Sequence, residues 1–481
     1  MASLRASLKK EADVIVIGGG VVGALVLRAL SKYRLRVLLL EKGNDFASGV
    51  TRANSAVIHA GFDPKPGTKK AKLNVLGNAM FPSLCAQLNV PYIPLASLVT
   101  AYAEQEEETL ALLLAQGKEY GVPGLSILSR KEILEKEPNM ARTAVAALYA
   151  PSSAIVSPWE VAIGAVENAC QNGAEALRGR TVTAITREND RFIVTVQTTE
   201  GQEVYACRCL VSAAGVVADD ICRMLTEPDY KITGRRGHYF VLDKQAAGLI
   251  NHILFPCPSA KGKGVLILPE YHGRIMIGPD SESIDDKTDT ATVEEGLARV
   301  KEAAASYLSV PIPWRYLIRT FSGVRPTPST GDFIIRKHPS VPGFVEAAGI
   351  ESPGLASAPA IAQEVERLVL DVLGGAAQKD FDPVRQKYTA KPEKKDNTLV
   401  CRCSQVTRGQ IRDAIAGPCG ARTVKGVKLR TGTTAGACQG GFCLPDIVSV
   451  LSEELHIPKE QVLYDGPGSN LLTGPTRRGE H

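Results

Sequence analysis

The chain has 481 residues, of which 44% are hydrophobic and 22% are charged, as in an ordinary globular protein. At roughly 150 residues per domain, this length predicts about three units. The 56 Lys and Arg residues exceed the 51 Asp and Glu residues by a net charge of only +5, which excludes a nucleic-acid binder that works through bulk electrostatics. Glycine is frequent (44 residues) and aromatic residues are sparse (5%). This composition favours a nucleotide-binding α/β protein, whose backbone must approach phosphates closely.

The N-terminal region carries basic residues but no apolar stretch of the kind that a secretory signal needs. The longest apolar run, residues 14–27, is interrupted by glycines and is too short to span a bilayer. We therefore expect a cytoplasmic protein that reaches the inner face of the membrane only through partners.

The periodicity of the sequence changes along the chain. Residues 14–17 and 36–40 are apolar, as buried parallel strands are, and a helical pattern lies between them. Further helices are predicted at 105–120, 130–137, 158–172, 291–308 and 356–373, and strands at 181–187, 192–197, 209–213, 238–243, 265–269, 274–278, 332–336 and 344–348. Residues 374–399 are polar and contain several Lys and Pro residues, which predicts a linker. A compact unit with four closely spaced cysteines follows.

A glycine motif joins the first predicted strand to the first predicted helix. Residues 18–23 (GGGVVG) match G-x-G-x-x-G. In this motif Gly18 permits the tight turn, Gly20 lets a pyrophosphate approach, and Gly23 lets helix and strand pack closely. The N-terminus of the helix offers unpaired N–H groups to the phosphates. Glu41 ends the second strand, where a carboxylate can accept from ribose hydroxyls. These features predict a dinucleotide site but leave FAD and NAD both open.

Four ordered segments carry a resemblance to a known family. They are residues 48–61 (SGVTRANSAVIHAG), 209–219 (CLVSAAGVVAD), 321–327 (FSGVRPT) and 349–355 (GIESPGL). They resemble motifs of the FAD-dependent family that includes D-amino-acid oxidases and glycerol-3-phosphate dehydrogenases, although Val217 replaces the family's usual Trp. The resemblance spans about residues 12–375 and implies FAD rather than NAD.

The family resemblance also implies where the cofactor lies. Its binding residues are expected in the glycine turn, at strand ends, in the segment after the second strand and in the closing motif. They are Gly18, Gly20, Val22, Gly23, Glu41, Lys42, Thr51, Asn54, Ser55, Val182, Ala214, Gly215, Gly349, Gly354 and Leu355.

The tail unit is marked by its cysteines. Cys401 and Cys403 form C-x-C, and Cys438 and Cys443 form C-x4-C. Four such thiolates suit either tetrahedral zinc or an iron–sulfur cluster, but C-x-C is tight for a zinc knuckle. The pattern and the glycines around it resemble the bacterioferritin-associated-ferredoxin-like domain, which implies a 2Fe–2S cluster held by these four cysteines.

Two further expectations concern the remaining cysteines and the charges of the tail unit. The other cysteines are expected to be small buried hydrophobes for the most part, and disulfides are not expected without an export signal. Lys425, Lys428 and Arg430 could offset the charge of a cluster, but a solvated basic face is the simpler interpretation.

Together these resemblances imply an α/β fold with three parts. A Rossmann-like FAD-binding domain is interleaved with a mixed-sheet α+β substrate domain, and a small C-terminal iron–sulfur domain follows. The FAD-binding domain is expected at residues 1–85, 150–225 and 320–375, and the substrate domain at 86–149 and 226–319. The linker is expected at 376–399, the 2Fe–2S domain at 400–470 and a short tail at 471–481.

Three histidines are candidates for removing a proton, since a neutral imidazole suits that task near neutral pH. By resemblance, His59 runs beside the flavin and is a candidate catalytic residue. His238 matches a position that carries a substrate-facing histidine in glycerol-3-phosphate dehydrogenases, and is a second candidate. His272 sits at the expected tip of a hairpin and is a candidate substrate contact. Each could instead be a turn or core histidine.

Arg325 is the best candidate for binding an anionic substrate, because a guanidinium can hold a carboxylate or phosphate through two parallel contacts. In the family this arginine faces the substrate; a structural ion pair is the alternative. Arg336 and Tyr239 are expected as further substrate contacts. The closing motif lacks the lysine that binds phosphate in membrane-linked glycerol-3-phosphate dehydrogenases, and Glu351 would repel a phosphate. It looks instead like the motif of the short anaerobic glycerol-3-phosphate dehydrogenases, which also resemble 2-hydroxyglutarate oxidases.

The sequence therefore predicts an FAD-dependent dehydrogenase for a small anionic secondary alcohol, either glycerol 3-phosphate or a 2-hydroxy acid. Electrons are expected to leave through the 2Fe–2S cluster to a partner subunit or a quinone-linked acceptor, within a hetero-oligomer and without any nucleic-acid partner. Two alternatives remain open: an amine or imino-acid dehydrogenase of the sarcosine or proline type, and a non-catalytic electron-transfer protein that retains FAD.

Overall fold

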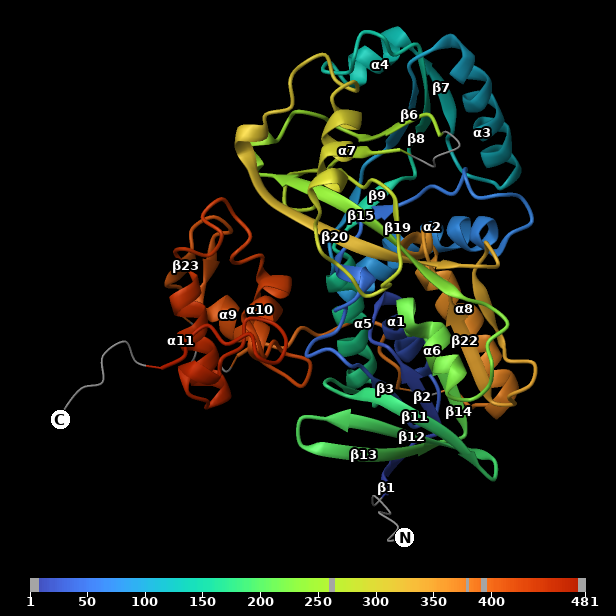
Figure 1. Cartoon of the computed structure of the whole chain (residues 1–481), viewed down its shortest axis with the longest axis vertical. Helices are drawn as coiled ribbons and strands as arrows, with labels where there is room; N and C mark the ends of the chain where they lie inside the picture. The colour runs from blue at the N-terminus through green and yellow to red at the C-terminus, as the bar shows by residue number, and fades with distance from the viewer. Residues whose placement is uncertain (1–7, 259–263, 378–379, 391–395, 475–481) are drawn as a thin grey trace, which may run out of the picture.

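The computed structural model describes residues 8–258, 264–377, 380–390 and 396–474. The chain forms a two-domain body, with a tail domain beside it (Figure 1). Within the described residues, no helix is both long enough and apolar enough to cross a membrane.

The FAD-binding part is built on a six-stranded sheet in the order β10-β3-β2-β14-β22-β21. All neighbouring strands are parallel except β21, which pairs antiparallel with β22. The strands are β2 (Val14–Ile17), β3 (Val37–Leu40), β10 (Glu175–Leu177), β14 (Cys209–Ser212), β21 (Ile334–Lys337) and β22 (Phe344–Ala348).

Each face of this sheet is covered by a different layer, because successive strand residues point to opposite faces. Val14 and Val16 pack with the helices α1 (Val21–Leu30), α2 (Lys69–Leu88), α5 (Pro158–Gln171) and α8 (Gly354–Leu373). Ile15 and Ile17 pack with a second sheet of β1 (Leu8–Glu11), β13 (Gly201–Cys207), β12 (Arg191–Thr198) and β11 (Thr181–Glu188). The short helix α6 (Ala218–Arg223) follows β14.

The substrate part is a nine-stranded mixed sheet in the order β19-β15-β18-β17-β16-β6-β8-β7, with β20 paired to β15. Its strands are β6 (Ser97–Ala101), β7 (Ser126–Ser129), β8 (Ala146–Ala150), β15 (Ile232–Leu242), β16 (Ile253–Pro256), β17 (Leu266–Pro269), β18 (Ile275–Gly278), β19 (Glu282–Ile284) and β20 (Leu317–Pro328). The helices α3 (Glu107–Glu119), α4 (Arg130–Lys136) and α7 (Glu294–Ala304) flank it. A small sheet of β4 (Val57–Ile58), β9 (Ala154–Val156) and β5 (Tyr92–Pro94) lies near the join of the two parts.

The tail domain has its own apolar core, formed mainly by α9 (Arg408–Ile415), α10 (Val424–Thr431) and α11 (Leu444–Leu455). The hairpin β23 (Leu399–Cys401) and β24 (Val406–Thr407) precedes these helices. The tail domain therefore folds around side chains of its own, as the sequence predicts.

The structure corrects several expectations about organisation. The predicted domain boundary at residue 320 falls inside β20, which pairs along its length with β15 and so belongs to the substrate sheet. The boundary at 85/86 falls inside α2. The helix predicted at 291–308 spans only Glu294–Ala304.

The predicted linker is not a solvated tether where the structure describes it. Arg385 forms an ion pair with Glu167 of α5 (2.6 Å), and the carbonyl of Pro383 accepts from the buried Arg28 of α1 (2.9 Å). The carbonyl of Asp382 accepts from two Asn side chains of α5 and its C-terminal end. The segment is therefore bound to the FAD-binding part before it reaches the tail domain.

Candidate active site and cluster site

A large cavity of about 1800 Å³ lies where the three domains meet. The glycine turn and β3 form one end of its wall, β15 and β20 form another part, and α10 of the tail domain contributes to the same wall. A cavity of this size suits a dinucleotide together with a small substrate.

The glycine turn is shaped for a pyrophosphate. Gly18 has φ +104° and Gly20 lines the cavity. A Cβ on Gly23 would lie 2.0 Å from the carbonyl oxygen of Gly18, so this residue serves packing between helix and strand and does not line the cavity. Thr51 Oγ1 accepts from the N–H of Val21 (3.0 Å), which holds the segment after β3 against the start of α1.

Glu41 lies at the end of β3 and lines the cavity. Its two carboxylate oxygens accept from the N–H groups of Gly19 and Gly43, each at 2.6 Å. Burial raises the pKa of Glu41, and these two backbone donors act in the opposite direction. Each oxygen keeps a second lone pair with which it can accept from a ribose hydroxyl.

Most of the residues expected at the cofactor line this cavity: Gly18, Gly20, Val22, Glu41, Lys42, Thr51, Asn54, Ser55, Val182, Ala214, Gly215, Gly354 and Leu355. Two do not, Gly23 and Gly349. Gly349 has φ +64°, and a Cβ there would lie 2.6 Å from the Pro328 side chain. Its role is to let the chain turn before the closing motif.

The other end of the cavity is lined by strands β15 and β20. Tyr239 stacks on Phe321 with ring centroids 4.5 Å apart, and its hydroxyl lies 3.3 Å from Ser55 Oγ. Arg325 donates from Nη2 to the carbonyl oxygen of Asp280 (3.1 Å). Its Nη1 is buried, with no hydrogen-bond partner among the described residues. Burial raises the pKa of Tyr239, and the charge of Arg325 opposes that shift.

His59 lies at this same end of the cavity, with its ring 5.8 Å from that of Phe255. Its carbonyl oxygen accepts from Asn74 (2.8 Å) and Asn78 (3.1 Å), two buried side chains of α2. The backbone of His59 is therefore fixed by two amides that belong to no recognisable sequence motif. Tyr239, Arg325 and His59 all line the cavity, as expected of substrate-facing groups.

His272 also lines the cavity, from the turn between β17 and β18. Burial, with the positive charges of Arg274 and Lys244, lowers its pKa to about 4. His272 is therefore neutral at pH 7 and a weak base. A Cβ on Gly432 of the tail domain would lie 3.3 Å from its ring, so this histidine lies at the boundary between two domains.

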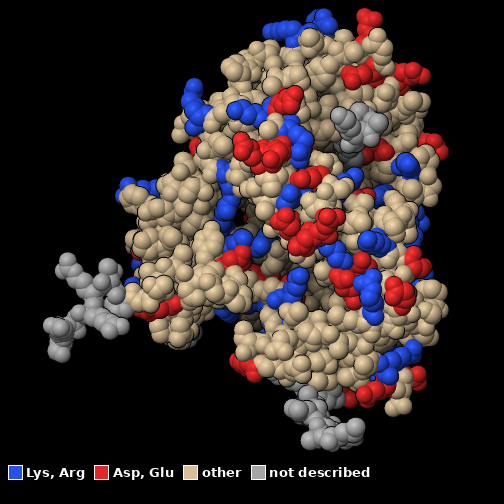
Figure 2. Space-filling model, in the orientation of Figure 1, with Lys and Arg blue, Asp and Glu red and all other residues tan. Residues whose placement is uncertain are grey.

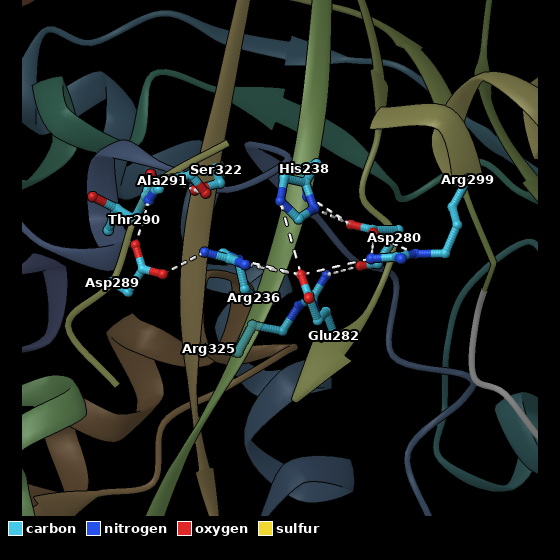
Figure 3. Close-up of polar contacts among 10 residues, drawn as sticks. All are labelled: Arg236, His238, Asp280, Glu282, Asp289, Thr290, Ala291, Arg299, Ser322 and Arg325. Carbon is cyan, nitrogen blue, oxygen red and sulfur yellow. Dashed lines mark hydrogen bonds and ion pairs between the residues drawn. The ribbon is translucent and has the colours of Figure 1, made fainter. Parts of the chain in front are cut away.

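The structure corrects the roles expected for His238 and Arg336. His238 is fully buried and lies outside the cavity lining, where its Nδ1 is 2.9 Å from Asp280 Oδ1 (Figure 3). Alternation along β15 explains this, since Tyr239 faces the cavity and its neighbour must face away. Arg336 pairs with Asp229 and with the buried Glu346, also outside the cavity lining. Neither side chain can touch a substrate held in this cavity.

The charge of Glu351 is compensated by neighbouring cations. Its carboxylate binds Lys70 (2.8 Å), Arg235 (2.9 Å) and the hydroxyl of Thr327 (3.0 Å). Two cations thus offset one carboxylate, and the repulsion of a phosphate expected from Glu351 is removed.

The four patterned cysteines converge in the tail domain. Cys403 Sγ lies 3.8 Å from Cys438 Sγ, and the thiol of Cys401 interacts with that of Cys443. A Cβ on Gly436 would lie 2.7 Å from Cys403 Sγ, so a glycine leaves the space beside this sulfur. Two close pairs of thiols fit two metal ions with two thiolate ligands each, which is how a 2Fe–2S cluster is held.

The cluster site is adjacent to the cavity wall. Gly432 and Ala435 line the cavity, and Gly436 contacts Cys403. Ser404, next to Cys403, donates to the carbonyl of Gly432 (2.8 Å). On the other side, Cys438 is exposed to solvent.

The basic residues of α10 do not form the solvated face expected from the sequence. Lys425 and Lys428 line the cavity, and Figure 2 shows basic side chains where the tail domain meets the body. Arg430 is not part of a solvated face, because it forms a buried two-contact pair with Asp45 (2.6 and 2.9 Å). Although burial acts to raise it, the pKa of Asp45 is held low by Arg430 and Arg178.

The remaining cysteines are reduced thiols and mostly buried. Burial raises the pKa of Cys85, Cys207, Cys209, Cys222 and Cys257, which fits packing roles. Cys419 differs, because its sulfur lies 3.9 Å from that of Cys170 across the boundary between the tail domain and α5.

The fold and the two sites define a flavoprotein that carries an iron–sulfur domain behind its flavin domain. Residues 13–368 match the family model described as FAD dependent oxidoreductase, and residues 399–453 match the BFD-like [2Fe-2S] binding domain. The chain belongs to the FAD-dependent oxidoreductase family, and its cofactors are FAD and a 2Fe–2S cluster. The choice of FAD over NAD, and of iron–sulfur over zinc, is thereby confirmed.

Several known proteins are similar to this chain in sequence or structure. A glycerol 3-phosphate dehydrogenase from Caloramator mitchellensis is 40% identical over 97% of this chain and 99% of its own length. A glycerol 3-phosphate oxidase from Mycoplasma pneumoniae is 31% identical over 74% of this chain and 94% of its own. The FAD-bound structure of the L-alpha-glycerophosphate oxidase from that organism has a TM-score of 0.73, with 29% identity over 78% of this chain and 98% of its own. An L-2-hydroxyglutarate dehydrogenase from Arabidopsis thaliana is 29% identical over 74% of this chain and 83% of its own.

Proposed function

We propose that this protein is an FAD-dependent dehydrogenase of glycerol 3-phosphate, and that its electrons leave through the 2Fe–2S cluster to a partner protein. The observation that carries the proposal is the Nη1 of Arg325, which is buried in the cavity beside Tyr239 without a partner among the described residues. A fixed guanidinium with a free N–H is suited to a phosphate or carboxylate oxygen. The 40% identity to a glycerol 3-phosphate dehydrogenase over almost the whole chain supports the phosphate.

The bound FAD supplies hydride acceptance, and the cluster accepts electrons one at a time. The chain's own part is to bind, orient and deprotonate the substrate. Arg325 holds the anionic group, Tyr239 forms an apolar wall with a polar tip, and His59 takes the proton of the alcohol. The pKa of His272, lowered by burial to about 4, makes it a weak base at pH 7. It serves instead as a neutral contact at the wall shared with the tail domain.

Electron exit through the tail domain is supported by the position of the cysteines. Cys401, Cys403, Cys438 and Cys443 are proposed as the cluster ligands. Gly436, which contacts Cys403, directly follows Ala435 of the cavity wall. On the far side, Cys438 is exposed and Phe442 is 56% exposed, with Arg402 stacked on its ring at 4.1 Å. A partner protein that receives electrons would dock there, within a hetero-oligomer.

A 2-hydroxy acid is the second candidate substrate, because a relative over 74% of the chain is an L-2-hydroxyglutarate dehydrogenase and Arg325 could equally hold a carboxylate. Anaerobic flavin bleaching separates the candidates. The purified holoenzyme would be mixed with glycerol 3-phosphate, 2-hydroxyglutarate, lactate or proline, and flavin and cluster absorbance followed together. We expect rapid bleaching by glycerol 3-phosphate, then loss of cluster absorbance. Bleaching by 2-hydroxyglutarate or lactate without bleaching by glycerol 3-phosphate would favour the second candidate over the first. Bleaching by proline alone, or by none of the four, would refute both.

A further inference from the structure

A dense ionic network lies at the cavity wall, and Asp280, Arg299 and Arg325 contribute both to the network and to the lining (Figure 3). It joins His238 and Arg236 of β15 to acidic residues on the segment that follows β18. Arg236 pairs with Asp289 (2.6 Å) and Glu282 (3.1 Å), and its side chain is only 6% exposed. None of these side chains is needed by the chemistry proposed above. Burying the charges of Arg236 and Asp280 is nevertheless costly unless each is paired and hydrogen-bonded.

Asp280 is the residue that connects this network to Arg325. Its Oδ1 accepts from the backbone N–H of His238 (2.7 Å) and lies 2.9 Å from Nδ1 of the same residue. Its Oδ2 accepts from Nε (3.0 Å) and Nη2 (2.8 Å) of Arg299. The carboxylate is therefore bound on both oxygens, and the side chain is only 5% exposed.

The backbone of Asp280 faces the opposite way, toward the cavity. Its carbonyl oxygen accepts from Arg325 Nη2 (3.1 Å). A Cβ on Gly237 would lie 2.8 Å from that Nη2 and 3.0 Å from that carbonyl oxygen. The absence of a side chain at Gly237 lets the carbonyl and the guanidinium meet.

The ring of His238 is closely packed against Gly296 of α7. A Cβ on Gly296 of α7 would lie 2.2 Å from Nδ1 of His238, so only glycine fits beside the ring. β15 and β20 are in register around this point, with Arg235 opposite Arg325. Asp280 is thus tied to β15 through His238 and to α7 through Arg299.

We propose that Asp280, held by His238 and Arg299, is the positioning residue of Arg325. One guanidinium nitrogen is bound to the Asp280 carbonyl, so that Nη1 is presented to the anionic group of the substrate. The inference rests on the proposed function, in which Arg325 binds that anion. Ordering a flexible arginine before the substrate arrives lowers the conformational cost of binding. A variant in which Asp280 is held less firmly should therefore raise KM more than it lowers kcat.

The test compares two Asp→Asn variants in the same network. Asp280→Asn keeps the size and the backbone carbonyl but removes the charge that binds Arg299. Asp289→Asn is the matched control, because Asp289 pairs with Arg236 and not with Arg325. The readouts are FAD content, KM and kcat for glycerol 3-phosphate, and the dissociation constant of inorganic phosphate from its effect on flavin absorbance.

We expect Asp280→Asn to raise KM and the phosphate dissociation constant on the order of 10-fold, as when a hydrogen bond to a charged group is lost. FAD content should be retained and kcat should change little, while Asp289→Asn should behave as the parent. Arg299→Ala, at a side chain 46% exposed, should give the same KM defect. Arg299→Lys should recover part of it, which a purely structural role would not require.

Arg325→Ala distinguishes the two possible failures. If Arg325→Ala leaves KM and phosphate binding unchanged, the proposed function of Arg325 is wrong. If Arg325→Ala weakens binding but Asp280→Asn and Arg299→Ala do not, the positioning role is refuted while the proposed function stands. Should Asp280→Asn fail to fold, Arg299→Ala combined with Arg325→Ala decides the question. No further loss of phosphate binding in the double variant supports positioning, whereas a further loss shows that Arg299, which also lines the cavity, binds the anion directly and refutes it.

Discussion

The buried pair between Arg430 and Asp45 should govern whether the tail domain stays on the body. Arg430→Ala would leave Asp45 in a buried position with Arg178 as its remaining cation, at 3.5 Å. Removing one partner of a buried pair typically costs about 3–5 kcal/mol, and because one cation remains we expect the lower end, about 3 kcal/mol. Arg430 also donates to the carbonyl of Cys419 (2.6 Å), and that contact would be lost as well.

The assay is denaturant unfolding of the holoprotein, with the cluster absorbance reporting the tail domain and the flavin absorbance reporting the body. Arg367→Ala is the control, since its ion pairs with Glu364 and Asp371 are largely exposed and exposed pairs contribute little to stability. Equal effects of the two variants on release of the tail domain would refute the reasoning.

The same pair gives a pH dependence with a definite sign. The pKa of Asp45 is lower in the folded protein than in the unfolded chain. Its contribution is therefore complete above the ordinary Asp pKa of about 3.9 and is lost as the pH falls through the folded value. The stability difference between the parent and Arg430→Ala should narrow at acid pH, and a difference that widens there would contradict this origin.

Three further changes test the other parts of the site. Cys438→Ser should abolish the cluster absorbance while glycerol 3-phosphate still bleaches the flavin; a simultaneous loss of bleaching would show that the two sites are not separable. Lys428→Glu should lower kcat/KM for a dianionic substrate by about 10-fold at low ionic strength and flatten its salt dependence, whereas an unchanged salt dependence would place Lys428 outside the path of the substrate. Gly23→Ala should abolish FAD retention because its Cβ would clash with Gly18, and Gly466→Ala, which meets nothing within 4 Å, is the control for flavin content.

Local motifs could be predicted because each is fixed by chemistry within a few residues. The turn at Gly18 needs φ +104°, which glycine adopts freely, and its place between two apolar runs leaves few alternatives. The cysteines of the tail are similar, since C-x-C can bring two thiols to one metal site only if the chain turns between them. For these elements the sequence pattern and the structure agree.

The strand β15 shows how alternation limits which neighbours can share a site. His238 and Tyr239 are adjacent, so a strand cannot direct both side chains to one face. The strand predicted at 238–243 is therefore incompatible with a substrate contact from both residues. The cavity is in fact lined by Arg235, Tyr239 and Val241 of this strand.

Other features could not be predicted because the signal is not local. Helix α2 contains Pro82 and buries Asn74, Asn78 and Gly77 beside its apolar residues, so polar and small residues interrupt the apolar stripe of its inward face. Asn74 and Asn78 bind the carbonyl of His59, and a Cβ on Gly77 would lie 2.1 Å from a carbonyl of α8. Likewise, only the docked tail domain reveals that Arg430 is buried against Asp45.

Because the tail domain forms part of the cavity wall, binding of FAD should depend on prior assembly of the 2Fe–2S cluster. Leu429 and Gly432 complete the lining only after the tail domain has folded and docked. A small metal-binding unit commonly needs its metal to fold, and here two of the cysteines precede α9 and the other two lie between α10 and α11. We therefore expect flavin retention to depend on the supply of iron and sulfide. Chains made under iron starvation should lose FAD more readily and expose what remains of it to dioxygen.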